Sequence, residues 1–351
     1  MIEIDDLLRR VVATNASDLH LRVPSPPVLR IDGDLRVQED LPVLSVKDAE
    51  AVLEQIATPE QRNVFARDME LDFAYSIPGL ARFRVNVLKQ RGSLSFCFRL
   101  VPNEIASIET LGLPLICKEL ILKPRGLILV TGPTGSGKST TMAAMINYLN
   151  ENSARNVITI ENPIEYLYRN RRCLIAQRDL GDDTHAFDIA LIHALRHDPD
   201  VIVVGEMRDL PTVTTALRAA ETGHLVMATL HTVDAAQTVD RVIDMYPSDQ
   251  QPQIRLQFSQ VLIAVLSQTL LPKATGEGRV AAFEIMIANT AVRNLIRGGK
   301  TYELNNTMQL NSSEGMQTLD QSLAGLVRMK VVTKEEALTH SSHPDRLRKL
   351  I

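Results

Sequence analysis

The sequence predicts an α/β protein in two parts that meet near residue 100. Before this point, short strands with alternating apolar residues surround one helix. After it, runs that are apolar throughout alternate with helical runs, which is typical of a doubly wound, mostly parallel sheet whose strands are buried on both faces. With 351 residues and 45% hydrophobic side chains, the chain is long enough to build two cores.

The first part, residues 1–99, is predicted to be a small α/β domain. Two extended segments open it, and the second turns at Asp32-Gly33-Asp34, a favoured hairpin sequence. A helix follows over residues 46–67 with an interruption at Pro59, and a three-strand meander ends the domain. Residues 100–112 are rich in helix and strand breakers and are predicted to form a linker.

The second part, residues 113–270, contains four predicted strands. Their sequences are GLILVTG, NVITIEN, DVIVVGE and HLVMATLH, and helices are predicted between them over residues 140–150, 187–196 and 210–222. Beyond residue 250 the chain is predicted to be mostly helical, apart from the strand RVAAFEIMI, and residues 271–351 are predicted to form the mostly helical C-terminal part of this domain.

A glycine-rich turn joins the first of these strands to a helix. It matches the phosphate-binding P-loop pattern with the residues Gly132, Pro133, Thr134, Gly135, Ser136, Gly137, Lys138, Ser139 and Thr140. The glycines allow backbone N–H groups at the start of the helix to approach phosphate oxygens. Lys138 supplies a charge for the terminal phosphates, and the Ser139 hydroxyl is placed to ligate Mg²⁺. The sequence therefore predicts a site for a nucleoside triphosphate with Mg²⁺.

Acidic residues end two of the strands. Glu206 follows the third strand, where a carboxylate can orient and deprotonate the water that attacks the terminal phosphate. Glu161 and Glu165 follow the second strand, and one of them can assist the metal or the water. Alternatively, all three glutamates could be solvated charges at strand ends. The presence of a P-loop argues against this alternative, and most strongly for Glu206.

Two histidines, His224 and His231, bracket the fourth strand. A single histidine is usually structural, but two histidines that flank a strand beside the P-loop strand are better explained as sensors of the terminal phosphate. They do not indicate a metal site, because no cysteine or third ligand stands at a suitable spacing.

These segments together resemble the secretion ATPase superfamily of type II secretion and type IV pili. The family patterns stand here as ITIENPIE at residues 158–165, DPDVIVVGEMRD at 198–209 and TGHLVMATLHT at 222–232. Other segments, such as ASDLHLR, QRDLGDDTHAF and VLSQTLLPK, also look like that family, so the resemblance covers nearly the whole chain. It implies a PAS-like small domain, a RecA-like P-loop domain that hydrolyses ATP, and assembly into a homo-hexameric ring.

Within this superfamily the chain is most similar to the pilus retraction ATPases of twitching motility. It begins directly at the small domain, residues 272–280 lack the four-cysteine zinc insert common in assembly ATPases, and AVRNLIRGGK and GMQTLDQSL look like retraction-family segments. The resemblance implies a motor that powers pilus retraction by acting on an inner-membrane platform protein, which would hold it at the cytoplasmic face of that membrane. An assembly or type II secretion ATPase is the alternative.

Two further groups of residues gain a role from this resemblance. Arg84 and Arg99 stand on the polar faces of two meander strands; a solvated face would explain them, but in the family such arginines reach the nucleotide when the two domains close. A helix over residues 291–297 would place Arg293, Asn294 and Arg297 opposite its apolar face. Spacing alone fits a solvated helix, and the resemblance makes it an element that couples hydrolysis to movement.

Three positions depart from the family pattern. Asn162 stands where an aspartate is usual, Ile192 where an arginine is usual, and Gly298 where the retraction ATPases have a glutamate. The first two bear on the rate of hydrolysis, and the third bears on the motor output.

The composition argues against a nucleic-acid motor, which is the other class of RecA-like ring. The net charge is −4, tryptophan is absent and only 4% of residues are aromatic, so few side chains can stack on single-stranded bases. We therefore expect no stable nucleic-acid binding. The acidic N-terminal residues and the lack of a long apolar run predict a cytoplasmic protein.

Overall fold

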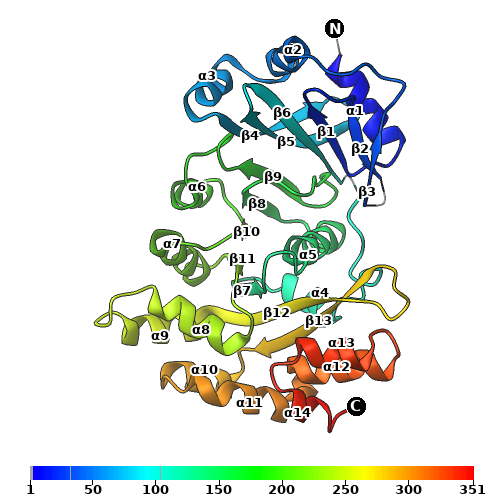
Figure 1. Cartoon of the computed structure of the whole chain (residues 1–351). Helices are drawn as coiled ribbons and strands as arrows, with labels where there is room; N and C mark the ends of the chain where they lie inside the picture. The colour runs from blue at the N-terminus through cyan, green and yellow to red at the C-terminus, as the bar shows by residue number, and fades with distance from the viewer. Residues whose placement is uncertain (1–2, 32, 103) are drawn as a thin grey trace. The chain divides into compact units, whose positions relative to one another are not determined.

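The computed structural model describes residues 3–31, 33–102 and 104–351. The chain divides into two compact units, Met1–Glu104 with Glu165–Leu167, and Ile105–Ile164 with Tyr168–Ile351. Each unit contains a sheet of its own (Figure 1). Asp32, in the predicted hairpin turn, lies outside the described residues.

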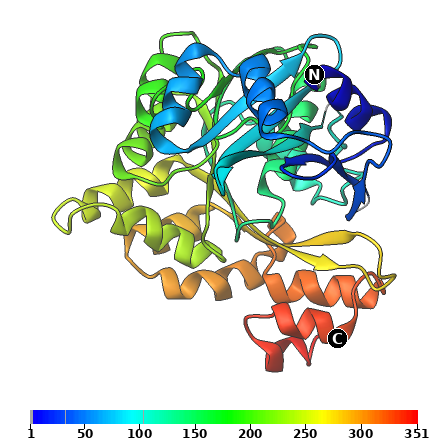
Figure 2. The same cartoon turned by 45° about the horizontal axis from the view of Figure 1, so that its top comes forward.

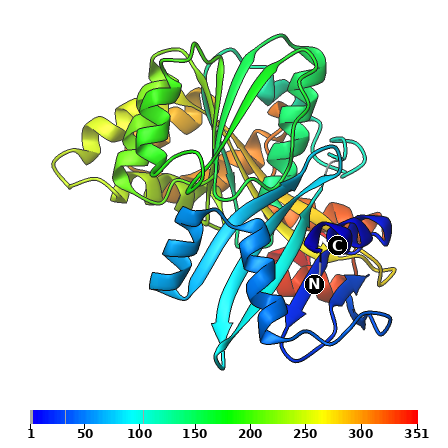
Figure 3. The same ribbon diagram turned by 90° about the horizontal axis from the view of Figure 1, so that it is seen from above.

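The smaller unit is built on an antiparallel six-stranded sheet of order β3-β2-β1-β6-β5-β4. The strands are β1 (Asp18–Arg22), β2 (Val28–Ile31), β3 (Asp34–Val37), β4 (Glu70–Ile77), β5 (Ala81–Gln90) and β6 (Ser93–Val101). The helices are α1 (Ile4–Ala13), α2 (Val46–Ile56) and α3 (Pro59–Asp68). Figure 3 shows α2 and α3 beside the strands of this sheet.

The predicted single helix with an interruption at Pro59 is confirmed as the pair α2 and α3. Thr58 caps α3 with Pro59 in its first turn, and the residue before a proline prefers an extended backbone, so the first helix ends before it. Helix α1 was not predicted, although its buried residues recur at helical spacing.

The larger unit contains a seven-stranded sheet of order β13-β12-β7-β11-β10-β8-β9 (Figure 1). Its strands are β7 (Gly126–Thr131), β8 (Asn156–Glu161), β9 (Leu174–Asp179), β10 (Val201–Val204), β11 (Leu225–Leu230), β12 (Leu262–Pro272) and β13 (Arg279–Ile287). All neighbours are parallel except β12 and β13. The doubly wound, mostly parallel sheet is therefore confirmed.

Two of these strands were missed by the sequence reasoning. The region of β12 was expected to be helical, and that expectation was wrong, because a short apolar run does not distinguish a buried strand from a buried helix. Strand β9 is an edge strand with mixed burial, so its sequence gives a weak signal. Beyond β13 the described chain forms helices but no further strand.

Helices cover both faces of the larger sheet. They are α4 (Ile116–Ile121), α5 (Lys138–Asn152), α6 (Phe187–Ala194), α7 (Leu210–Glu221), α8 (Ala235–Asp244), α9 (Gln251–Val261), α10 (Thr290–Arg297), α11 (Leu304–Leu310), α12 (Leu319–Arg328), α13 (Lys334–His340) and α14 (Pro344–Leu347). One core joins the sheet to α4 and α5, and another joins its other face to α6 through α11. Helices α12 and α13 pack on the β12–β13 hairpin, and α14 packs on these two helices (Figure 2).

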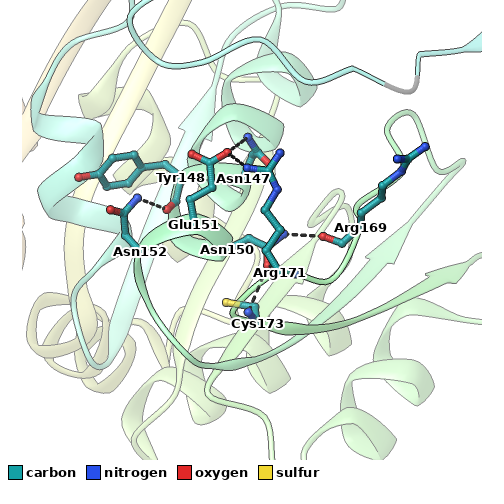
Figure 4. Close-up of polar contacts among 8 residues, drawn as sticks. All are labelled: Asn147, Tyr148, Asn150, Glu151, Asn152, Arg169, Arg171 and Cys173. Atoms are coloured by element: carbon teal, nitrogen blue, oxygen red, sulfur yellow. Dashed lines mark hydrogen bonds and ion pairs between the residues drawn. The ribbon is translucent and has the colours of Figure 1, made fainter.

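A buried asparagine ties the end of α5 to the chain that enters β9. The Asn150 side chain is 1% exposed; its Nδ2 donates to the Arg169 carbonyl (2.7 Å), and its Oδ1 accepts from the N–H groups of Arg171 (3.0 Å) and Cys173 (3.1 Å) (Figure 4). One side-chain amide thus provides hydrogen-bond partners for three main-chain groups of the connection that enters β9.

Among the described residues, none of the helices combines the length and the apolar character that a membrane span requires.

Candidate nucleotide site

The candidate site lies at the carboxyl ends of the parallel strands of the larger unit. Strands β7, β11, β10 and β8 are neighbours in this order, so the segments that follow them meet at one edge of the sheet. The P-loop, His231 and Glu206 follow β7, β11 and β10, and Glu161 is the last residue of β8. In open α/β sheets, ligands bind outside this edge.

The P-loop backbone has conformations that only glycine adopts without strain. Gly132, Gly135 and Gly137 have φ angles of 141°, 79° and 90°. A Cβ atom on Gly132 would lie 2.2 Å from the main-chain oxygen of Gln268 and 2.7 Å from the Ser136 hydroxyl. The loop is therefore packed too closely against β12 for any side chain at position 132.

The N-terminus of α5 is suited to an anion. The helix starts at Lys138, it has no acidic residue in its first turn, and no side chain among the described residues caps it. Its first N–H groups thus have no acceptor within the helix, and the helix dipole favours negative charge there.

Polar side chains of the P-loop surround this helix end. The Lys138 ammonium donates to the carbonyls of Gly132 (2.8 Å) and Pro133 (3.0 Å). The Ser136 hydroxyl is buried, with no hydrogen-bond partner among the described residues. Pro133, Thr134 and Gly135 are exposed, and Ser139 and Thr140 are partly exposed. A loop with positive-φ glycines, an uncapped helix end and an ammonium group fits a phosphate chain.

Glu206 is held between two basic side chains. Its side chain is only 18% exposed; Arg208 Nη2 lies 2.6 Å from one carboxylate oxygen, and His231 Nε2 donates to the other across 2.8 Å. Burial alone would raise the pKa of Glu206, but the Arg208 guanidinium and His231 hold it below its usual value. Glu206 is therefore an oriented carboxylate at neutral pH, able to accept a proton.

The carboxylate of Glu161 is oriented by one side chain from β8, its own strand, and by one from the neighbouring strand β9. The Thr159 hydroxyl (2.6 Å) and Gln177 Nε2 (3.0 Å) both donate to one of its carboxylate oxygens. Sequence reasoning missed Gln177 and Arg208 as supporting residues. Arg208 could have been found, because it alternates with Glu206 in the GEMRD segment; Gln177 could not, because it lies on a strand that was not predicted.

His224 lies away from the other candidate residues. It precedes β11, whereas His231 follows this strand of six residues, so the two histidines are separated by about 20 Å along the sheet. The Nδ1 atom of His224 lies 3.0 Å from the Ala219 carbonyl at the end of α7. The expectation that both histidines meet the same phosphate fails, because residues that bracket a strand stand at opposite edges of the sheet.

Arg293, Asn294 and Arg297 were expected to share one polar face of α10. This expectation was wrong for Arg293, which is only partly exposed. Its guanidinium donates to the main-chain carbonyls of Ala288, Ser259, Gln260 and Leu262. The last three end α9 and begin β12, so Arg293 satisfies carbonyls at a helix C-terminus. Asn294 and Arg297 are exposed and hydrogen-bonded to each other. Gly299, with φ at 67°, follows the end of the helix.

The arginines of the smaller unit are direct cross-strand neighbours. Arg84 on β5 pairs with Arg99 on β6, and Arg99 pairs with Asp18 on β1. The guanidinium of Arg99 donates to Asp18 (2.8 Å), whereas Arg84 lies 3.9 Å from Asp72. Both arginine side chains are at least 45% exposed, and the polar face predicted for these strands is confirmed.

Comparison with known proteins identifies relatives over nearly the whole chain. The model of the family described as type II/IV secretion system protein matches residues 2–338. The type IV pilus retraction ATPase PilT of Pseudomonas aeruginosa is 46% identical over 98% of this chain and 99% of its own length. A twitching motility protein of Neisseria gonorrhoeae is 47% identical over 89% of this chain and 83% of its own length. A crystal structure of the pilus retraction motor PilT with bound ADP matches with a TM-score of 0.93 at 44% identity, covering 99% of this chain and 100% of that one.

Proposed function

The chain belongs to the type II/IV secretion system protein family, and we propose that it is an ATP-driven motor that powers retraction of a type IV pilus. The arrangement at the carboxyl edge of the sheet supports hydrolysis, because a P-loop and an oriented carboxylate lie two strands apart, which is about 10 Å. The similarity to retraction and twitching proteins over nearly the full length supports the pilus as the object that is moved.

The P-loop would bind the phosphates of ATP. Its N–H groups and the start of α5 would face the phosphate oxygens, and Lys138 would leave the Gly132 and Pro133 carbonyls for the terminal phosphates. The Ser139 hydroxyl would ligate Mg²⁺, which neutralises phosphate charge when bound. Among residues 3–31, 33–102 and 104–351, no group of three or more His, Cys, Asp or Glu is arranged to hold a metal ion.

Glu206 would act as the general base. Its carboxylate accepts the proton of the attacking water, while Arg208 and His231 keep it ionised and oriented. His231 would also report the state of the terminal phosphate, because it directly follows β11, the strand beside the P-loop strand. Glu161, at the end of β8, would assist the metal or the attacking water. His224 has no part in this proposal.

Movement would come from closure of a small domain, residues 1–99, on an ATPase core, residues 113–270, about a linker at residues 100–112. Arg84 and Arg99 would then contact the nucleotide, a contribution worth about 10³–10⁵ in rate in other NTPases. In a homo-hexamer, such rigid-body movements become strokes. Residues 271–351 would form the mostly helical part of the ATPase domain.

The output would pass to an inner-membrane platform protein at the cytoplasmic face of the membrane. We name the exposed pair Asn294 and Arg297 the coupling surface, because these residues remain available on α10 once Arg293 is used to hold α9. Gly298, in place of the family's glutamate, makes this region less acidic.

Deletion of the gene tests the direction of movement. If the protein is a retraction motor, cells that lack it have surface pili that extend but do not shorten. A gene that encodes the Lys138→Ala variant should fail to restore shortening to these cells. A strain that lost its surface pili would indicate an assembly ATPase instead. The turn between β12 and β13 argues against that alternative, because residues 273–278 contain no cysteine for a zinc insert.

A nucleic-acid motor is tested separately with the purified protein. We expect ATP hydrolysis that requires Mg²⁺ and is unchanged by single-stranded DNA. A large stimulation by DNA would favour a nucleic-acid motor over the proposed function.

A further inference from the structure

Gln268, in the middle of β12, lies directly beside the P-loop. The residue is 3% exposed, and its Nε2 donates to the Ser136 carbonyl across 2.6 Å. Its own main-chain oxygen occupies the space that a side chain on Gly132 would need. Gln268 thus contacts the P-loop with both its side chain and its main chain.

A glutamine at this position is costly for the fold. Burying an amide loses its hydrogen bonds to water, and here only the nitrogen end regains one, because Oε1 has no partner among the described residues. An apolar residue of the same size would fill the space without this penalty. The neighbouring residue in β12, Ser267, already connects the strand to β7 through the Thr131 hydroxyl (2.8 Å). Holding the two strands together therefore does not require Gln268.

The hydrogen bond from Gln268 determines which way one peptide group of the P-loop points. In a planar trans peptide, the C=O and N–H groups point in opposite directions. Because the Ser136 carbonyl points to Gln268 on β12, the N–H of Gly137 points away from Gln268. Gly137 has a φ angle of 90°, which permits this orientation.

We propose that Gln268 is a positioning residue of the nucleotide site, which holds the Ser136–Gly137 peptide so that the Gly137 N–H faces the phosphates of the bound nucleotide. The inference rests on the proposed function, because it assumes that the P-loop binds ATP. Gln268 itself does not touch the phosphates. It stabilises the binding-competent conformation of the loop before the nucleotide arrives, which lowers the free-energy cost of binding.

The test compares two glutamines that make similar bonds. Gln317 Nε2 donates across 2.9 Å to the carbonyl of Phe283 on β13. Phe283 is the cross-strand partner of Gln268, and β13 is one strand further from the P-loop strand than β12. Gln268→Met and Gln317→Met each remove one such bond and keep the size of the side chain. We expect Gln268→Met to raise the Kd for ADP and the KM for ATP about tenfold with a smaller change in kcat, and Gln317→Met to change neither. Thermal unfolding of both variants measures how much stability each bond contributes.

Gln268→Glu adds a readout that a structural role would not move. An ionised carboxylate cannot donate to the Ser136 carbonyl, whereas a protonated carboxyl can. ADP affinity of this variant should therefore recover toward that of the wild type as the pH falls. Unchanged ADP affinity in Gln268→Met, or equal losses in Gln268→Met and Gln317→Met, would overturn the inference and leave the proposed function intact. A wild-type protein that binds no nucleotide would instead overturn the proposed function.

Discussion

The two ends of the seven-stranded sheet bear similar polar residues, but these residues have different partners. At the carboxyl end, His231 and Arg208 contact the carboxylate of Glu206. At the amino end, His224 and Arg293 contact main-chain carbonyls at the ends of α7 and α9. A side chain bound to a carboxylate can exchange that partner for substrate during a reaction, whereas one that satisfies helix carbonyls is required where it is.

The same difference appears within a single helix. Arg293 and Arg297 lie one turn apart on α10, yet only Arg297 is exposed. Arg293 binds main-chain carbonyls at the amino end of the sheet, whereas Arg297 is exposed on the surface of the helix. Residues in one signature segment can thus have unrelated roles, and variants should separate them.

The largest effect should follow a change at the carboxyl end. Glu206→Gln keeps the shape of the side chain but removes the base, so ATP turnover should fall by about 10²–10⁴ while ATP affinity stays within a few-fold. Glu221→Gln, on α7 near the amino end, is the matched control and should turn over normally. Steady-state kinetics beside binding titrations measure both quantities. Near wild-type turnover in Glu206→Gln would transfer the role of base to Glu161.

At the amino end we expect a loss of stability rather than of chemistry. Arg293→Ala leaves the carbonyls of Ser259, Gln260 and Leu262 without their donor, and it should lower the free energy of unfolding by about 3 kcal/mol. Arg297→Ala should lower it by less than about 0.5 kcal/mol. Urea denaturation of both variants tests the distinction. Equal free energies of unfolding for the two variants would mean that the hydrogen bonds of Arg293 contribute no more to stability than those of Arg297.

A buried acid makes the stability of the carboxyl end depend on pH. Glu284 on β13 pairs with Ser267 of β12, and it accepts a hydrogen bond from the Ala235 N–H of α8 (2.8 Å). Burial, with smaller contributions from Asp234 and Asp320, raises the pKa of Glu284 from 4.5 to about 7. Between these values the folded state binds a proton that the unfolded state does not, so stability falls as the pH rises through this window.

Glu284→Gln tests this pH dependence. The wild type should lose about 2 kcal/mol of stability between about pH 5 and pH 7 through Glu284, and the variant should lack this loss because a glutamine does not titrate. Urea denaturation at the two pH values provides the measurement. An identical pH dependence in both proteins would show that Glu284 titrates normally.

The smallest of these effects separates the two histidines. His231→Ala removes a donor to Glu206, and ATP turnover should fall about tenfold. His224→Ala should leave turnover unchanged, because its ring contacts only the end of α7 and Thr222 among the described residues. A comparable loss of turnover in both variants would show that residues at both ends of the sheet take part in hydrolysis.

Local patterns predicted much of this site, and long-range pairing explains what they missed. The P-loop residues and Glu206 stand next to recognisable strands, so their positions followed from the sequence. Three of the four carbonyls that Arg293 contacts are more than thirty residues away in the chain, and Gln268 reaches Ser136 across 132 residues. Spacing along one helix or strand contains no information on which carbonyls another element brings beside it.

If chemistry at the carboxyl end of the sheet drives pilus shortening, loss of the base should stop shortening in cells. Fluorescence microscopy of labelled pili in cells that express Glu206→Gln or Glu221→Gln in place of the wild type tests it most directly. We predict that pili shorten normally with Glu221→Gln and extend without shortening with Glu206→Gln. Normal shortening with Glu206→Gln, at wild-type expression levels, would show that chemistry at this end of the sheet does not drive shortening.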